Sequence, residues 1–264
     1  MSADDPVDAD LRLAVTGAGG RMGREVIEAA AAREDVAVAA AVNRTPTDPV
    51  AGVAVADADR LDELLAAEAP DALVDFTGPD SAVAYAEACA DAGVPLVTGT
   101  TGFADAQVDS LRAVSEAVPV LTASNFARGV AALRRAVREA AAALPGYDVE
   151  LTETHHNAKR DAPSGTATSI LDDVEGVRDD LDRRVHGREG DAPREATEIG
   201  VHARRAGDVT GEHEVVFAGN REAIELTHRA GDRGVFAEGA LDAADWLAGR
   251  DPGWYGFGDV LDAG

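Results

Sequence analysis

Cysteine, lysine and long apolar runs are scarce or missing in this chain of 264 residues. The single cysteine, Cys89, excludes an intrachain disulfide and a metal site built from cysteines. No run of 18 apolar residues is present, so no segment is a candidate to span a membrane. The first ten residues are acidic, whereas a secretory signal peptide is basic and then apolar. We therefore expect a cytoplasmic protein with no membrane partner.

Charge of one sign dominates the composition. Asp and Glu number 49 against 24 Lys and Arg, which gives a net charge of −25. This balance argues against a nucleic-acid partner, which requires basic surface. Of the basic residues 23 are arginine, and Lys159 is the only lysine. Such a composition resembles that of proteins from halophilic archaea, where molar salt shortens the Debye length to about 3 Å and screens self-repulsion.

Strand and helix signals alternate through the first half of the chain. Short apolar runs predict strands at Leu11–Thr16, Val36–Val42, Ala72–Phe76, Pro95–Gly99 and Pro119–Ala123. Longer segments between them predict helices at Arg21–Ala32, Leu61–Glu68, Ser81–Ala92 and Ala104–Ala117. This alternation predicts an α/β fold with a Rossmann-like, doubly wound parallel sheet.

The pattern changes after about Asn125. A long amphipathic helix is predicted first, and period-two alternation then predicts strands with one solvated face. The helix is Gly129–Leu144, and the strands are Asp148–His156, Gly211–Phe217 and Ala223–His228. The polar stretch Val177–Ala196 is predicted to be loop, and Val235–Leu247 to be a final helix before a short tail. We therefore expect a smaller α+β domain with a mixed sheet.

A glycine-rich turn follows the first predicted strand and opens the first predicted helix. Its residues are Gly17, Ala18, Gly19, Gly20, Arg21, Met22 and Gly23. Glycine lets the backbone approach a pyrophosphate, and the helix N-terminus supplies oriented N–H groups. The spacing is G-x-x-G-x-x-G, because Met22 occupies the last glycine position of the usual G-x-G-x-x-G. The strand-turn-helix context favours dinucleotide binding over a plain tight turn.

The end of the second predicted strand bears on the choice of cofactor. An Asp or Glu there would bind the ribose 2′-hydroxyl of NAD, but this chain has Asn43-Arg44. Arg44 can pair with a 2′-phosphate, and the alternative is an ordinary surface arginine. Both NADPH and NADH therefore stay open as cofactors.

Three further strand ends are polar or glycine-rich. They are Asp75-Phe76-Thr77, the loop of Gly99, Thr100, Thr101 and Gly102, and the loop of Ala123, Ser124, Asn125 and Phe126. Taken singly, each is an ordinary turn. Because ligands of open α/β sheets bind beyond the carboxyl ends of the strands, the two loops are predicted to contact the nicotinamide and its ribose.

The segment from Glu153 to Ala167 gathers groups for proton transfer and anion binding. His155 and His156 end a strand, Lys159 follows, and a Pro-Ser-Gly-Thr turn leads into a helix starting near Gly165. Histidine can give or take a proton near neutral pH, and lysine offers a charge or a proton. Ser164 or Thr166 can cap the helix, whose N-terminus binds anions. These groups predict a cationic, proton-donating pocket for an acidic small molecule.

Two other interpretations of this segment are a metal site and a structural loop. A metal site is not expected, because adjacent strand residues point to opposite faces and no third ligand is spaced for zinc. A structural loop with incidental histidines is the other alternative. The lone lysine argues against it, because a chain that otherwise uses arginine has a lysine where a proton can be given up.

Taken together, these motifs resemble those of the dihydrodipicolinate reductase (4-hydroxy-tetrahydrodipicolinate reductase) family. The resemblance covers nearly the whole chain, and the pairing of His-His-x-x-Lys with Pro-Ser-Gly-Thr is highly specific to the family. It implies NAD(P)H-dependent reduction of 4-hydroxy-tetrahydrodipicolinate to tetrahydrodipicolinate, with loss of water, in lysine and diaminopimelate biosynthesis. Family members often carry Glu where this chain has Asn43.

The resemblance also implies an organisation and a set of roles. Residues 1–126 with 237–264 would form the dinucleotide-binding domain, and residues 127–236 a substrate-binding and oligomerisation domain of a homotetramer. His155 would be the general acid and Lys159 a second catalytic cation. His156, Gly165 and Thr166 would hold the substrate carboxylates. The cofactor contacts would be Gly17–Met22, Arg44, Gly99–Thr101 and Ala123–Phe126.

Two rival functions stay open on the sequence. Another Rossmann reductase, such as an amino-acid dehydrogenase, would share only the first domain and would lack the His-His-x-x-Lys and Pro-Ser-Gly-Thr pair. A catalytically silent NADPH-sensing regulator would keep the glycine turn without needing the cationic pocket.

Overall fold

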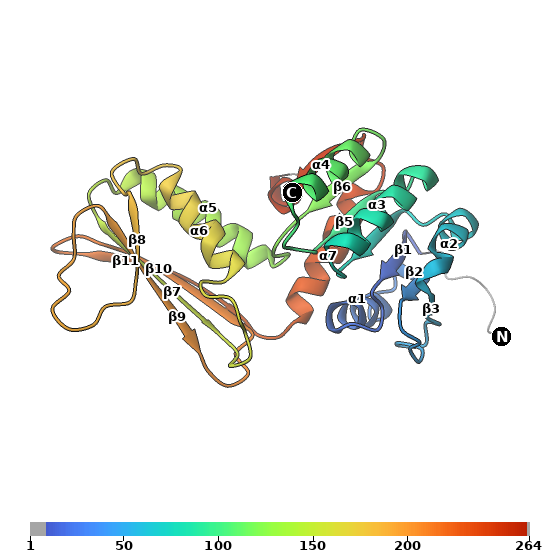
Figure 1. Cartoon of the computed structure of the whole chain (residues 1–264), viewed down its shortest axis with the longest axis horizontal. Helices are drawn as coiled ribbons and strands as arrows, with labels where there is room; N and C mark the ends of the chain where they lie inside the picture. The colour runs from blue at the N-terminus through green and yellow to red at the C-terminus, as the bar shows by residue number, and fades with distance from the viewer. Residues whose placement is uncertain (1–8, 263–264) are drawn as a thin grey trace. The chain divides into compact units, whose positions relative to one another are not determined.

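The chain divides into two compact units in its computed structural model, which describes residues 9–262 (Figure 1). One unit extends to Phe126 and includes the residues from Arg233 onward, and the other is Ala127–Asp232. The boundary expected between residues 236 and 237 falls inside helix α7 (Gly234–Leu247), which belongs whole to the first unit. Of the acidic N-terminal segment, residues 1–8 lie outside the described residues. No helix in the described range is long and apolar enough to cross a membrane.

The first unit is built on a parallel sheet with the strand order β12-β6-β5-β4-β1-β2-β3. Its strands are β1 (Leu11–Thr16), β2 (Val36–Asn43), β3 (Ala56–Asp57), β4 (Ala72–Asp75), β5 (Leu96–Thr98), β6 (Pro119–Thr122) and β12 (Gly253–Gly256). From β1 the chain adds strands first on one side and then, from β4, on the other. This confirms the predicted doubly wound sheet and sets its switch point at the carboxyl ends of β1 and β4, where such sheets bind ligands.

Helices cover both faces of this sheet (Figure 1). They are α1 (Arg21–Ala31), α2 (Leu61–Glu68), α3 (Pro79–Ala92), α4 (Asp105–Val114), α7 and α8 (Phe257–Asp262), with a 3₁₀ turn at Ala58–Arg60. Helices α2, α3 and α4 pack in series, whereas α1 packs against α7. Cys89 of α3 is fully buried in the core among Tyr85, Leu96 and Leu111.

The last long helix, α7, packs closely against the sheet because its buried face consists mostly of small residues. Its buried residues include Ala237, Gly239, Ala240 and Ala244. A Cβ on Gly239 would lie 1.8 Å from the carbonyl oxygen of Phe126, so only glycine allows the helix to approach the end of β6 this closely. Helix α7 thereby supports the loop that carries part of the predicted cofactor site.

The second unit has a mixed sheet with the order β11-β10-β7-β9-β8. Its strands are β7 (Asp148–His155), β8 (Arg183–His186), β9 (Glu198–Arg205), β10 (Gly211–Ala218) and β11 (Ala223–Ala230). Pairing is antiparallel from β7 through β10 to β11 and parallel from β7 through β9 to β8, as a mixed sheet requires. Helices α5 (Arg128–Ala143) and α6 (Gly165–Glu175) lie along one face (Figure 1). Leu151, Ile170 and Phe217 are fully buried in the core they enclose.

Three stretches differ from the prediction. The expected loop Val177–Ala196 contains the edge strand β8. Its charged Arg-Arg-Val-His sequence has no apolar alternation to indicate a strand, and ion pairs, among them Arg184 with Glu175, help to hold it in place. Strand β9 was not predicted, although Ile199 and Val201 fill the core. The expected short tail forms β12 and α8, since Gly-Trp-Tyr-Gly has too little apolar pattern to indicate a strand pairing with β6.

We expect the fold to weaken in low salt. The net charge of −25 repels itself once the Debye length grows from about 3 Å in molar salt to about 10 Å at about 0.1 M. The unfolding midpoint, followed by circular dichroism, should fall steadily as KCl is lowered over that range. Sucrose at matched osmolality is the control, because it favours compact states without screening charge. A midpoint that is flat down to low salt would contradict the prediction.

Candidate functional site

The glycine turn has the geometry of an anion-binding loop. Gly17 has a φ of +65°, a left-handed conformation, and its carbonyl accepts a 2.8 Å hydrogen bond from the N–H of Gly20. A Cβ on Gly23 would lie 2.2 Å from the Gly17 oxygen, so the first turn of α1 can approach the loop only with glycine there. Gly20 is the N-cap of α1 and no side chain caps the helix. The helix therefore begins with N–H groups and positive dipole directed at the loop.

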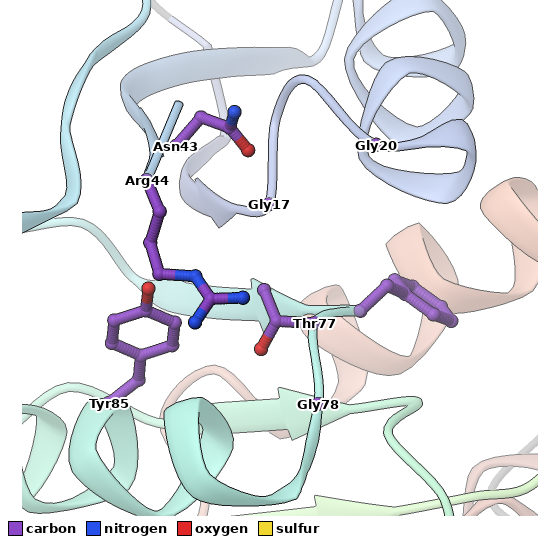
Figure 2. Close-up of a pocket in the computed structure, with 8 residues that line it drawn as sticks. Gly17, Gly20, Asn43, Arg44, Thr77, Gly78 and Tyr85 are labelled. Carbon is purple, nitrogen blue, oxygen red and sulfur yellow. The ribbon is translucent and has the colours of Figure 1, made fainter. Parts of the chain in front are cut away.

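A pocket of about 250 Å³ opens beside this turn at the ends of β1, β2 and β4. It is lined by Gly17, Gly20, Asn43, Arg44, Phe76, Thr77, Gly78 and Tyr85. Figure 2 shows the Arg44 guanidinium extending into it, between Tyr85 and Thr77, with Gly17 and Gly20 on the opposite rim. Arg44 makes no ion pair with any residue that the structure describes. Its charge is thus available to an anionic ligand in the pocket.

Asn43 is used to shape the loop that follows β2. Its amide nitrogen donates to the carbonyl of Thr45 at 2.7 Å and to Thr47 Oγ1 at 3.3 Å. A Cβ on Gly19 would fall within 2.8 Å of this amide, so the glycine turn and the β2 loop are in close contact. No carboxylate occupies this position. Among the described residues that line the pocket, none carries a carboxylate that would repel a phosphate beside Arg44.

Asp75 holds the rim of the pocket together. It is fully buried at the end of β4 and accepts four hydroxyl hydrogen bonds. The donors are Thr16 at 2.8 Å, Thr77 at 2.6 Å, Thr98 at 2.8 Å and Thr100 at 2.8 Å. These threonines come from the ends of β1, β4 and β5. One carboxylate thus fixes the neighbouring loops, a role that sequence reasoning did not assign although it placed Asp75 on this rim.

The other two predicted cofactor loops meet beside the sheet. Thr100, Thr101, Ala123 and Ser124 line a common pocket of about 370 Å³ together with Trp254 of β12. Gly99 faces the ring of Phe76, from which a Cβ would be only 2.0 Å away. The rest of the predicted set is placed differently. Ala18 and Phe126 are buried, Arg21 is exposed, and Gly19, Met22 and Asn125 are half-buried.

In the second unit, Glu153 and His155 form the centre of the second predicted site. Both lie on the inner face of β7 and are buried. The Glu153 carboxylate meets His155 Nδ1 at 2.6 Å and accepts from both terminal nitrogens of Arg205 at 2.8 Å. Burial raises the pKa of Glu153, but the hydrogen bonds from Arg205 and His155 outweigh it and the pKa is lowered. For His155 burial dominates and lowers its pKa, even beside the carboxylate.

Lys159 returns toward this pair through a tight turn. Its backbone N–H donates to the carbonyl of His156 at 3.1 Å, and its Nζ pairs with Asp161 at 2.9 Å. The charge of Lys159 acts on His155, where it opposes protonation. His156 follows the strand and is half-buried. The structure thus brings Lys159 near His155 and adds Asp161, a partner that the sequence did not single out.

The N-terminus of α6 faces the same segment. Ser164 is the N-cap, and its Oγ accepts from the N–H of Ala167 at 3.1 Å, which decides the cap in favour of Ser164 over Thr166. The same Oγ lies 3.1 Å from Nε2 of His213. Apart from its chain neighbours and the backbone of its own helix, no described residue lies within 4 Å of where a Cβ on Gly165 would be, so space is open beside the first turn. Burial lowers the pKa of His213 to about 4, which keeps this histidine neutral.

No group of three or more His, Cys, Asp or Glu side chains that could hold a metal ion occurs within residues 9–262. Groups of three kinds are present in the two units: a histidine that can transfer a proton (His155), a lysine that carries charge (Lys159), and helix N-termini that can bind anions (those of α1 and α6).

Comparison with known proteins covers both units. Residues 11–126 match the family model "Dihydrodipicolinate reductase, N-terminus", and residues 129–261 match "Dihydrodipicolinate reductase, C-terminus". A 4-hydroxy-tetrahydrodipicolinate reductase of Haloarcula marismortui is 54% identical over an alignment of 263 residues, which covers 96% of this chain and 99% of that protein. The enzyme of the same name from Natronomonas pharaonis is 52% identical, over 95% of this chain and 100% of that protein.

Solved structures agree with the fold. Dipicolinate-bound dihydrodipicolinate reductase from Paenisporosarcina sp. TG-14 has a TM-score of 0.76 at 25% identity, covering 95% of this chain and 99% of that chain. An amine dehydrogenase from Mycobacterium smegmatis has a TM-score of 0.63 at 14% identity, over 95% and 96%. The second likeness concerns the fold alone.

Proposed function

The chain belongs to the dihydrodipicolinate reductase family, and from this premise we propose that it reduces 4-hydroxy-tetrahydrodipicolinate to tetrahydrodipicolinate with NAD(P)H and loss of water. It is an oxidoreductase of lysine and diaminopimelate biosynthesis that uses a nicotinamide cofactor and a small-molecule substrate. The observation that carries the proposal is the segment around His155. There a buried histidine, the only lysine and the open N-terminus of α6 are gathered within one short stretch of chain.

The second unit supplies the groups for a dicarboxylate. The α6 N-terminus at Gly165 and Thr166 offers backbone N–H groups and the positive end of a helix dipole. His156 and Lys159, which precede α6 in the same segment, are proposed to add hydrogen-bond donors for the second carboxylate. Two carboxylates on one small ring require two such anion sites, and this segment has both a helix N-terminus and a cationic turn.

The first unit fits a dinucleotide. The loop of Gly17, Gly20 and Gly23 is proposed to bind the pyrophosphate. A side chain at Gly23 would collide with Gly17 and push the start of α1 away from this loop. The loops Gly99–Thr101 and Ala123–Phe126 are proposed to contact the nicotinamide and its ribose. When bound, the reduced nicotinamide supplies a hydride to the substrate ring. Arg44 and the absence of a carboxylate at Asn43 suit a 2′-phosphate, so we propose that NADPH is used at least as well as NADH.

His155 and Lys159 are proposed to carry the proton chemistry. Reduction of the ring leaves an enamine that must take up a proton, and His155 is the group positioned to donate it. Lys159 is the second catalytic cation, which balances the negative charge of the bound dicarboxylate and, unlike an arginine, can also give up a proton. The protein is further proposed to act as a cytoplasmic homotetramer, as the family resemblance implies.

A nicotinamide absorbance assay tests the function. Purified protein in molar KCl is mixed with NADPH or NADH and freshly made 4-hydroxy-tetrahydrodipicolinate, and we expect the reduced-nicotinamide band to decay. A parallel reaction with oxidised cofactor and a panel of amino acids tests the amino-acid dehydrogenase alternative. NADPH binding without turnover in either reaction would support the sensor alternative and contradict the proposal.

Arg44→Ala tests the cofactor assignment. We expect KM for NADPH to rise about tenfold or more, because a hydrogen bond to a charged group contributes roughly 1.5–3 kcal/mol. KM for NADH should change little, since NADH has no 2′-phosphate. Arg60→Ala is the matched control, because Arg60 is an exposed arginine of the same unit that pairs only with the nearby Glu63 among described residues. Equal weakening of both cofactors, or rejection of NADPH by the wild type, would contradict the assignment.

A further inference from the structure

The Glu153 carboxylate is buried and has a full set of partners. One oxygen accepts from Arg205 at 2.8 Å and from the backbone N–H of Ser164 at 3.2 Å. The other accepts from Arg205 at 2.8 Å and contacts His155 Nδ1 at 2.6 Å. A bidentate guanidinium and a backbone N–H hold this carboxylate in its charged form. An ionised carboxylate can only accept hydrogen bonds.

That restriction decides which nitrogen of His155 carries hydrogen. Because the carboxylate cannot donate, Nδ1 of His155 must be the donor. In the neutral ring Nε2 is then the bare nitrogen, and it is the only one left to gain or give a proton. Nε2 faces Gly211 of β10, where a Cβ would come within 3.2 Å, so glycine keeps this edge of the ring uncrowded.

Arg205 joins both proposed catalytic groups. Besides Glu153, its guanidinium donates to the carbonyl of Asp161 at 2.5 Å. Asp161 in turn pairs with Lys159 at 2.9 Å. One guanidinium at the end of β9 therefore fixes His155 through Glu153 and fixes the turn of Lys159 through Asp161.

From these contacts we propose that Glu153 and Arg205 are positioning residues for the reductase reaction. They hold the proton on Nδ1 of His155, so that Nε2 exchanges the proton with the substrate, and they set the Lys159 turn beside it. The inference rests on the proposed function, in which His155 is the general acid. The titratable and charged groups around the His155 ring are Glu153, Lys159, Arg205 and His213. Of these, only Glu153 bonds to the ring.

Glu153→Gln tests the proposal with little change of shape. An amide cannot satisfy Arg205, Ser164 and Nδ1 together, and it carries no charge to favour the imidazolium. We expect kcat to fall about 10²-fold, the lower end of what a positioned proton donor contributes. The alkaline limb of the kcat profile should move to lower pH, because loss of a neighbouring negative charge lowers the pKa of His155 further. Affinity for dipicolinate, measured by calorimetry, should change less than about threefold.

Glu198→Gln is the matched control. Glu198 is equally buried in the same sheet and pairs with Arg183 and Arg188, but among described residues it does not touch His155. Its loss should lower the unfolding midpoint and leave kcat and the pH profile unchanged. Arg205→Lys keeps the charge without the two-pronged contact and should give an intermediate kcat. Wild-type kcat and pH profile in Glu153→Gln would overturn the proposal.

Nitrogen NMR of the wild-type protein decides the tautomer without relying on a variant that must fold. The His155 signals are those lost in His155→Asn. Above its pKa we expect the Nδ1 shift of a protonated nitrogen and the Nε2 shift of a bare one, and the reverse would overturn the proposal. The two hypotheses fail separately. Wild-type protein without reductase activity removes the proposed function, whereas the wrong tautomer in an active enzyme removes only the positioning role.

Discussion

Lys159→Arg is expected to lower kcat on the order of 10²–10⁴-fold, the contribution typical of a positioned proton-transfer group. Arginine keeps the positive charge, but its planar guanidinium is larger and does not release a proton near neutral pH. It would also have to replace a compact ammonium in the 2.9 Å pair with Asp161. Steady-state kinetics with saturating cofactor measure the effect. Near-normal turnover in Lys159→Arg would contradict the catalytic assignment.

Chemical labelling gives an independent measurement of the same residue. Because Lys159 is the only lysine, an amine-selective reagent can react only there and at the terminal amine. We expect labelling of Lys159, mapped by mass spectrometry, to inactivate the protein, and dipicolinate with cofactor to protect it. Arg160→Lys is the control, since it adds an amine at a neighbouring exposed position. Label at residue 160 should form with or without dipicolinate. Full activity with Lys159 completely modified would end the assignment.

His155→Ala is expected to lower kcat by a similar factor, on the order of 10²–10⁴-fold. His156→Ala, by contrast, should act mainly through KM, as expected for a group that binds substrate and transition state alike. Both variants should fold, which the circular dichroism midpoint checks. A His155→Ala enzyme that keeps the wild-type pH profile would show that another group supplies the proton.

The pH profile of the wild-type enzyme follows from the lowered pKa of His155. A general acid must be protonated, so kcat/KM should fall as pH rises through the pKa of the free enzyme, which lies below the ordinary 6.5. A bound dicarboxylate brings two negative charges that favour the imidazolium. The limb in kcat should therefore lie at higher pH than the limb in kcat/KM. Coincident limbs would argue against His155 as the group that titrates.

Prediction from sequence worked where a residue's neighbours along the chain decide its structure. The apolar runs of β4 and β5 are fully buried strands and that of β1 is buried except at Arg12, and each is followed by the loop that the sequence placed at the site. It failed where a partner far away decides. β8 is an edge strand made of charged residues, and its existence depends on pairing with β9.

The same division applies to the site residues. Glu153 was within reach of sequence reasoning, because period-two alternation on a strand puts residues 153 and 155 on one face. Arg205 was given no role, since its place opposite His155 comes from the pairing of β7 with β9, two strands that are far apart in the chain. Likewise, the four threonines around Asp75 are brought together by the pairing of β4 with β1 and β5, and no local sequence pattern predicts that contact.

Cys89 gives this protein a built-in reporter of local opening. The thiol is fully buried on α3, and burial raises its pKa well above the ordinary value, so in the closed protein it is both inaccessible and un-ionised. A thiol reagent can therefore reach it only when the core of the nucleotide-binding unit opens. Since the chain has no other cysteine, the labelling rate reports that unit alone and is silent about the unit that carries His155. The opening free energies of the two units are thus separable in one unmodified chain, by thiol exchange for the first and amide exchange for both.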